Sequence, residues 1–244
     1  MPDSEIPSLW RISAFERLRQ SDGTSAFAGL SGPTVLSSTL QAELSTLERR
    51  QQGADALEIF AVCLRLREPA LIYLQCSQHV WPVTLFPAEL LYHSPRSLLE
   101  NSPYALAAIK VLEIVPPGVR QPGHPMHERI AQPDRYHPLL PALWRLALDG
   151  PRMMLLAEIG GTAAYRVLRH PHRDNLPTPG ALGPAVDRLR RETVALRKIA
   201  LWPGMSVERG MRLLNALYLT SNLMVTRSSP SARPEPDASA LHRR

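Results

Sequence analysis

Residues 55–86 of the chain read DALEIFAVCLRLREPALIYLQCSQHVWPVTLF, and they predict a helix followed by two strands. Asp55 is a favoured N-cap residue, and the stretch after it is apolar on nearly all sides, as is typical of a buried helix. Pro69 ends this helix because proline cannot continue the helical hydrogen bonding. Residues 70–74 and 81–86 are rich in β-branched and aromatic side chains, which favour strands, and the polar residues between them favour a turn.

A similar order of features recurs 82 residues further along the chain. It predicts a helix over residues 139–148 and strands over residues 153–159 and 162–168, with Gly160-Gly161 as the hairpin turn between the strands. We therefore expect an α+β fold, in which a small sheet packs against helices and contains an internal helix–hairpin repeat.

Residues 184–227 contain a second set of helical patterns. These patterns predict a helix to about residue 191 that either runs on or restarts at residue 193, then a tight break, a helix that Ser206 caps, and a strand over residues 223–227. The helix after the break, expected over residues 206–220, has a continuous apolar face of Val, Met, Leu and Tyr side chains.

This order of helix, tight break, helix and strand resembles the winged helix-turn-helix superfamily. The resemblance covers about 45 residues and is carried by TVALRKIA (193–200), PGMS (203–206) and LLNALYL (213–219). It implies that the helix over 206–220 is the recognition helix and that a wing lies near Arg227. The side chains that it offers to a protein partner or to nucleic acid are Arg209, Arg212, Asn215 and Arg227.

Basic residues outnumber acidic ones, with 28 Lys and Arg against 22 Asp and Glu and a net charge of +6. Nearly all are arginines, whose planar guanidinium suits bidentate binding of phosphate or carboxylate. The charge therefore leaves nucleic acid and an acidic protein surface open as partners. Because apolar residues dominate the 206–220 helix, its composition favours core packing or a protein contact over base reading.

No motif of catalytic chemistry stands out in the sequence. It contains no GxSxG nucleophile motif and no glycine-rich phosphate loop, and Gly160-Gly161 fits a hairpin turn. Cys63 and Cys76 form no CxxC pair, so we expect them to be small core residues. We therefore expect no enzymatic activity and no cofactor.

Three histidines, His124, His127 and His137, are the candidates for a metal site, because imidazole and the nearby carboxylates could ligate zinc or iron. They lie in a proline-rich stretch that predicts a loop, which favours a polar surface over a metal site. Four arginines are candidates for anion binding, although caps and strand-face charges are commoner reasons for such residues: Arg96, Arg145, Arg152 and Arg166.

The composition predicts five segments, because stretches rich in Ser, Pro, Gly and His favour linkers and tails. They are a mobile N-terminal arm with short helices (1–53), an α+β domain (54–170), a linker (171–183), a winged-helix-like module (184–228) and a disordered tail (229–244). The sequence has no apolar run of membrane-spanning length and does not start like a secretory signal, so we expect a cytoplasmic protein without a membrane partner.

The sequence favours a non-enzymatic bacterial regulatory or adaptor protein that acts through protein–protein contacts. Its partner would be another protein, with a homodimer as a further option. The alternative is a DNA-binding transcriptional regulator that uses the C-terminal module. A third hypothesis is a metal-dependent enzyme centred on His124 and His127.

Overall fold

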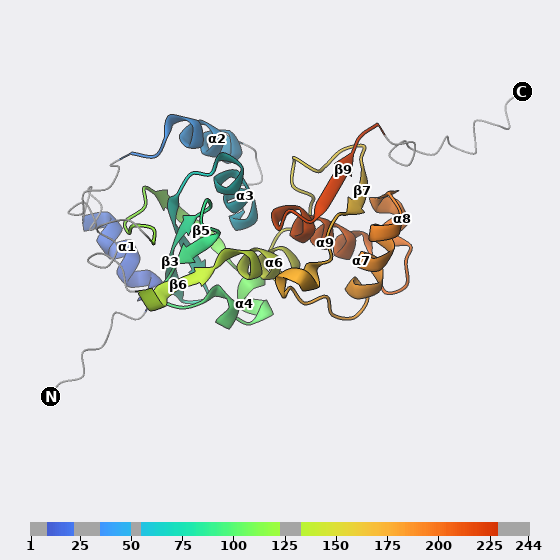
Figure 1. Ribbon diagram of the computed structural model, residues 1–244. Coiled ribbons are helices and arrows are strands. Elements are labelled where there is room, and N and C mark those ends of the chain that lie inside the picture. The colour runs from blue at the N-terminus through green and yellow to red at the C-terminus, as the bar shows by residue number, and fades with distance from the viewer. Residues whose placement is uncertain (1–8, 22–34, 50–54, 123–132, 229–244) are drawn as a thin grey trace, which may run out of the picture. The chain divides into compact units, whose positions relative to one another are not determined.

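The chain forms two compact units in the computed structural model, which describes residues 9–21, 35–49, 55–122 and 133–228 (Figure 1). Unit 1 is Met1–Arg152 and unit 2 is Met153–Arg244. Each unit has its own helices and its own antiparallel sheet. The predicted α+β class is therefore confirmed.

Unit 1 is built around an antiparallel sheet. Its strands are β1 (Trp10–Arg11), β2 (Ala70–Cys76), β3 (His79–Phe86), β4 (Leu91–His93), β5 (Lys110–Val115) and β6 (Tyr136–Pro138). The strands follow the order β5-β2-β3-β4-β6, and β1 pairs with β3 beside this path. The hairpin predicted from residues 55–86 is confirmed, since β2 and β3 pair along their whole length with Ile72 opposite Val83.

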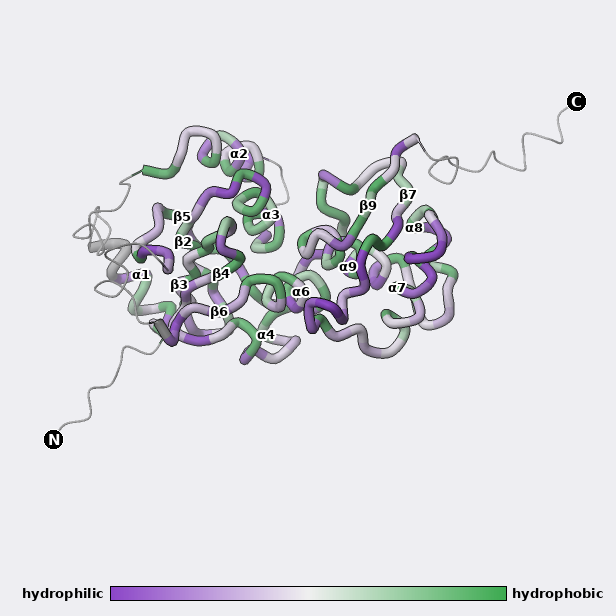
Figure 2. Tube along the Cα trace, in the orientation of Figure 1, coloured by the Kyte–Doolittle hydropathy of each residue, from purple (hydrophilic) through white to green (hydrophobic). Residues whose placement is uncertain are grey.

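The core of unit 1 lies between this sheet and a group of mostly apolar helices (Figure 2). They are α3 (Ala56–Leu66), the short helix η1 (Leu98–Glu100), α4 (Pro103–Ala107) and α6 (Leu139–Asp149). A further short helix, η2 (Pro133–Arg135), is polar and directly precedes β6. Asp55 caps α3 as predicted, because its carboxylate accepts a hydrogen bond from the Glu58 amide at 2.9 Å. Phe60 of α3 and Trp144 of α6 are fully buried, as the apolar patterns require.

The described part of the predicted N-terminal arm belongs to unit 1. It forms β1, α1 (Ile12–Ser21) and α2 (Ser38–Arg49). Phe15 of α1 packs on Tyr73 of the sheet with ring centroids 4.9 Å apart. Leucines 40, 44 and 47 of α2 are buried, and α2 packs on α3. The prediction of a separate arm is therefore wrong for residues 9–21 and 35–49, because their apolar faces are covered.

Unit 2 has a three-stranded antiparallel sheet in the order β8-β7-β9. Its elements are β7 (Ala164–Val167), η3 (Pro171–Asp174), α7 (Leu182–Arg191), β8 (Val194–Ala195), α8 (Leu196–Ala200), α9 (Val207–Leu219) and β9 (Leu223–Thr226). The three helices and the last strand thus follow the predicted order. The middle strand of the sheet, however, is β7, which precedes the three helices in the chain. Strand β9 pairs with β7 along its whole length.

The predicted internal repeat is wrong in its second hairpin. Residues 153–159 form no strand, and β7 pairs with β8 and β9 instead of with them. The predicted domain boundary at residue 170 is wrong for the same reason, since the division falls after Arg152. The predicted linker also belongs to unit 2, because Pro171 and Leu176 within it are buried.

The turn between α8 and α9 depends on two glycines. Gly204 has a φ of +73°, a backbone conformation that residues with a side chain rarely adopt. A Cβ atom at this position would lie 2.8 Å from the Cβ atom of Ala181. Gly210 lets α8 and α9 approach closely, since a Cβ at this position would lie 2.7 Å from the Leu196 Cδ1 atom. The turn and the angle between the two helices are therefore specified by the sequence.

Candidate partner-binding surface

All four predicted binding residues form contacts within unit 2, and three of them are arginines. The Arg209 guanidinium donates to the Gly204 carbonyl at 2.6 Å. Arg212 pairs with Glu208 one turn earlier at 2.9 Å. The Arg227 guanidinium donates to the carbonyls of Glu158 and Gly160 at 3.0 and 2.8 Å, and so holds the loop before β7. These arginines brace the module that was expected to use them for recognition.

The fourth residue, Asn215, is not on a surface. It is 1% exposed and lies on the inner side of α9. Its Oδ1 atom accepts from the Leu156 amide, and its Nδ2 atom donates to the Met154 carbonyl, both at 2.9 Å. The prediction that Asn215 contacts a partner or nucleic acid is therefore wrong. Its amide instead bonds the backbone of the segment that was expected to form a strand.

Two apolar side chains are exposed at the α8–α9 turn, where the polar Ser206 is exposed as well. Leu201 follows α8 and is 83% exposed, and Val207 begins α9 and is 53% exposed. Between them, Trp202 is buried beneath the Arg188 guanidinium, which lies 4.8 Å from the ring centroid. This cation–π contact ties α7 to the turn. We name Leu201 and Val207 together the apolar corner.

The positive charge of the chain resides in unit 2. Residues 1–152 contain 14 Lys and Arg and 15 Asp and Glu, whereas residues 153–244 contain 14 and 7. The colouring of α7 and α8 in Figure 2 shows this hydrophilic character. An acidic partner or nucleic acid would therefore be attracted to unit 2 rather than to unit 1.

Three arginines of unit 2 line a hollow of about 480 Å³. Arg166 comes from β7, and Arg190 and Arg191 come from the last turn of α7. Asp187 is the acidic residue that lines it, and its Oδ1 atom lies 3.6 Å from the His170 Nε2 atom. Val167, Leu168 and Met224 complete the lining with apolar surface. We name this site the basic hollow.

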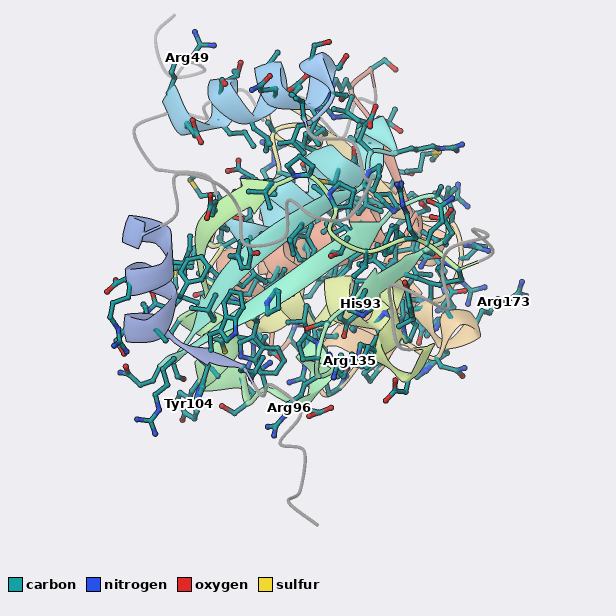
Figure 3. The ribbon with its side chains drawn as sticks, turned by 90° about the vertical axis from the view of Figure 1, so that its left-hand side faces the viewer. Arg49, His93, Arg96, Tyr104, Arg135 and Arg173 are labelled. Carbon is teal, nitrogen blue, oxygen red and sulfur yellow. The ribbon has the colours of Figure 1, made fainter. Side chains whose placement is uncertain are left out.

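The remaining anion candidates have other surroundings. Arg152 is buried in an ion pair with Asp55 at 2.7 Å and Glu58 at 3.1 Å. Arg145 pairs with Asp149 in α6 at 2.7 Å. Arg96 points outward from unit 1 (Figure 3). Of the four predicted candidates, only Arg166 lines the basic hollow.

The metal candidates lie partly outside the described residues, since His124 and His127 belong to residues 123–132. His137 is on β6, where its ring packs on that of Tyr92 with centroids 5.2 Å apart. Where the structure describes the chain, no three His, Cys, Asp or Glu side chains are grouped to hold a metal ion.

The two cysteines are buried, as predicted. Burial raises the pKa of the Cys63 thiol to about 12. It also raises the pKa of Cys76, whose sulfur donates to the Asn101 side-chain oxygen at 3.1 Å. Both groups are therefore thiols at neutral pH rather than nucleophilic thiolates.

Among the described residues, no helix could cross a lipid bilayer. The chain matches no protein-family model, and no curated protein or solved structure is found to be similar to it. The site must therefore be interpreted from its own geometry.

Sequence reasoning missed the residues that the structure exposes. The exposure of Leu201 and Val207 depends on the α8–α9 turn, so the apolar pattern alone could not reveal it. Arg190 and Arg191 belong to residues 188–227, which are rich in arginine. Only the folded sheet brings Arg166 close to them. The sequence thus shows that basic residues are clustered, but it does not show where in the fold they form a binding site.

Proposed function

We propose that the chain is a non-enzymatic regulatory or adaptor protein of the cytoplasm, and that unit 2 docks on a partner protein through the apolar corner. The main support is the contrast between the polar and the apolar side chains along α8 and α9. The polar residues expected to read bases are buried or bonded within the unit, whereas Leu201 and Val207 face solvent. Exposed apolar side chains at a turn between two helices favour a protein contact.

Unit 1 would contribute a second contact surface or a dimer interface. Its central strands β2 and β3 are mostly buried, so contacts would have to come from the edge strands or from the periphery of the unit. Tyr104 on α4 is 90% exposed and projects from the unit (Figure 3). Exposed tyrosines are favoured in protein interfaces because they combine an apolar ring with a hydroxyl group.

The alternative is a DNA-binding regulator, which the excess of basic residues in unit 2 favours. The helix-turn-helix order of α8 and α9 also agrees with the resemblance to winged helices. Against it, the described part of α9 offers few polar side chains that are not already used within the unit. Phosphate contacts alone would give binding without sequence preference.

A titration of a labelled random-sequence duplex at about 50 and about 200 mM salt separates these functions. We expect anisotropy to show at most weak binding at low salt, and none tighter than about 1 µM at about 200 mM salt, where charge alone binds weakly. The doubly substituted Lys198→Gln, Arg209→Gln protein is the matched variant, because both side chains are exposed on α8 and α9. Tighter binding that this variant loses would contradict the protein-contact proposal and support the DNA regulator.

A further inference from the structure

We propose that the basic hollow of unit 2 binds an extended acidic segment of a partner protein that carries an apolar side chain beside its carboxylates. The inference rests on the proposed function and adds the chemistry of the partner. It concerns a different set of residues from the apolar corner, so the two surfaces can be tested separately.

The three arginines of the hollow outnumber Asp187, the acidic residue of its lining. Among the residues that the structure describes, Arg166, Arg190 and Arg191 form no ion pair or hydrogen bond through their side chains. Two other arginines of unit 2 are in ion pairs. Arg188 pairs with Glu192 at 3.7 Å, and Arg212 pairs with Glu208. Three guanidinium groups without an ion pair therefore line the same hollow.

A helix terminus accounts for only part of this arrangement. Cations in the last turn of a helix are favoured by the helix dipole, which explains Arg190 and Arg191. It does not explain Arg166, which comes from β7 and faces the same space. With three arginines against Asp187 alone, the lining has an excess of positive charge. Carboxylates can accept bidentate hydrogen bonds from such guanidinium groups.

The apolar part of the lining favours a peptide over a nucleic acid. Leu168 is 57% exposed and Met224 is 37% exposed, and both lie in the hollow with the arginines. A phosphate backbone has no apolar group to place against them. A segment in which Glu or Asp residues flank a Leu, Ile or Phe satisfies both parts of the surface.

The direct test uses a fluorescein-labelled peptide of sequence GEELEELEEG and the full-length protein. We expect the peptide to bind saturably, with an affinity about tenfold or more lower for the Arg190→Gln, Arg191→Gln protein. We also expect a version of the peptide with Ser in place of Leu to bind the wild-type protein more weakly. Arg173→Gln is the matched control, because Arg173 is exposed on η3 and does not line the hollow. Its affinity should equal that of the wild-type protein.

A second readout reports where the peptide binds. Burial lowers the pKa of His170, and the neighbouring charges of His172 and Arg190 lower it further, whereas Asp187 raises it. Carboxylates bound beside Arg190 would stabilise the protonated imidazole. The pKa of His170, followed by NMR, should therefore rise when the peptide is added.

Three results would overturn the proposal. They are no binding of the acidic peptide, equal binding of a peptide in which every Glu is Gln, and a random-sequence duplex that binds in preference to the peptide and loses affinity in the Arg190→Gln, Arg191→Gln protein. The Leu201→Ser, Val207→Ser protein should bind the peptide normally. If the wild-type protein binds the peptide but no partner protein contacts its apolar corner, only the proposed function is contradicted.

Discussion

Replacing Asn215 by leucine is expected to destabilise unit 2 by about 4 kcal/mol, because each buried backbone group left without a partner costs about 1–3 kcal/mol. Leucine keeps the branched shape of asparagine but can neither accept from the Leu156 amide nor donate to the Met154 carbonyl. The Leu156 amide and the Met154 carbonyl would then lose their hydrogen bonds to Asn215, which residues 153–159 have in place of strand pairing. The loss should be confined to unit 2.

Hydrogen exchange followed by mass spectrometry measures this effect for each unit separately. Peptides from α9 should exchange much faster in the Asn215→Leu protein, and peptides from α3 in unit 1 should not change. Arg209→Leu is the control on the same helix, because it removes one exposed hydrogen bond and should cost about 1 kcal/mol or less. Unchanged protection of α9 in the Asn215→Leu protein would show that the amide does not hold this segment.

Replacing Arg152 by methionine is expected to destabilise unit 1 by about 3–5 kcal/mol, because removing one partner of a buried ion pair leaves the other charge uncompensated. The Arg152 side chain is 6% exposed, and those of Asp55 and Glu58 are 23% and 16% exposed. The two carboxylates stand at the start of α3, so the loss also loosens the cap of this helix. Urea unfolding of the variant should show a much lower midpoint for unit 1.

Arg145→Met provides the matched comparison for Arg152. It removes an arginine from α6 whose pair with Asp149 is about a third exposed, at 30% and 29%. Such a pair contributes about 0.5 kcal/mol because solvent screens it. If the two variants were equally stable, burial of the Arg152 pair would not be the source of its contribution.

The part of the fold that local patterns determine could be predicted from the sequence. The capped helix and the β2–β3 hairpin depend on neighbouring residues, and residues 55–86 contain all of them. The strand predicted over 153–159 failed because Asn215, about 60 residues away, bonds the backbone there. No periodicity within the segment can reveal a partner so distant in sequence.

The candidate site shows the same limit. The basic character of residues 188–227 is visible in the sequence, but the exposure of single residues is not. Asn215 was expected to contact a partner and is buried, whereas Val207, on the expected apolar face of the helix, is exposed. Which face of α8 and α9 meets solvent depends on how they pack against each other, with Gly210 at their closest approach.

Contact between the apolar corner of unit 2 and a partner protein can be measured by site-specific photo-crosslinking, with p-benzoylphenylalanine at position 201 or 207 of the full-length protein in its native cells. Thr162, exposed in the loop before β7, is the control position. We expect discrete adducts from positions 201 and 207 that protease removes and nuclease does not, and none from position 162. Adducts that nuclease removes, or no adducts at either corner position, would contradict the proposed contact.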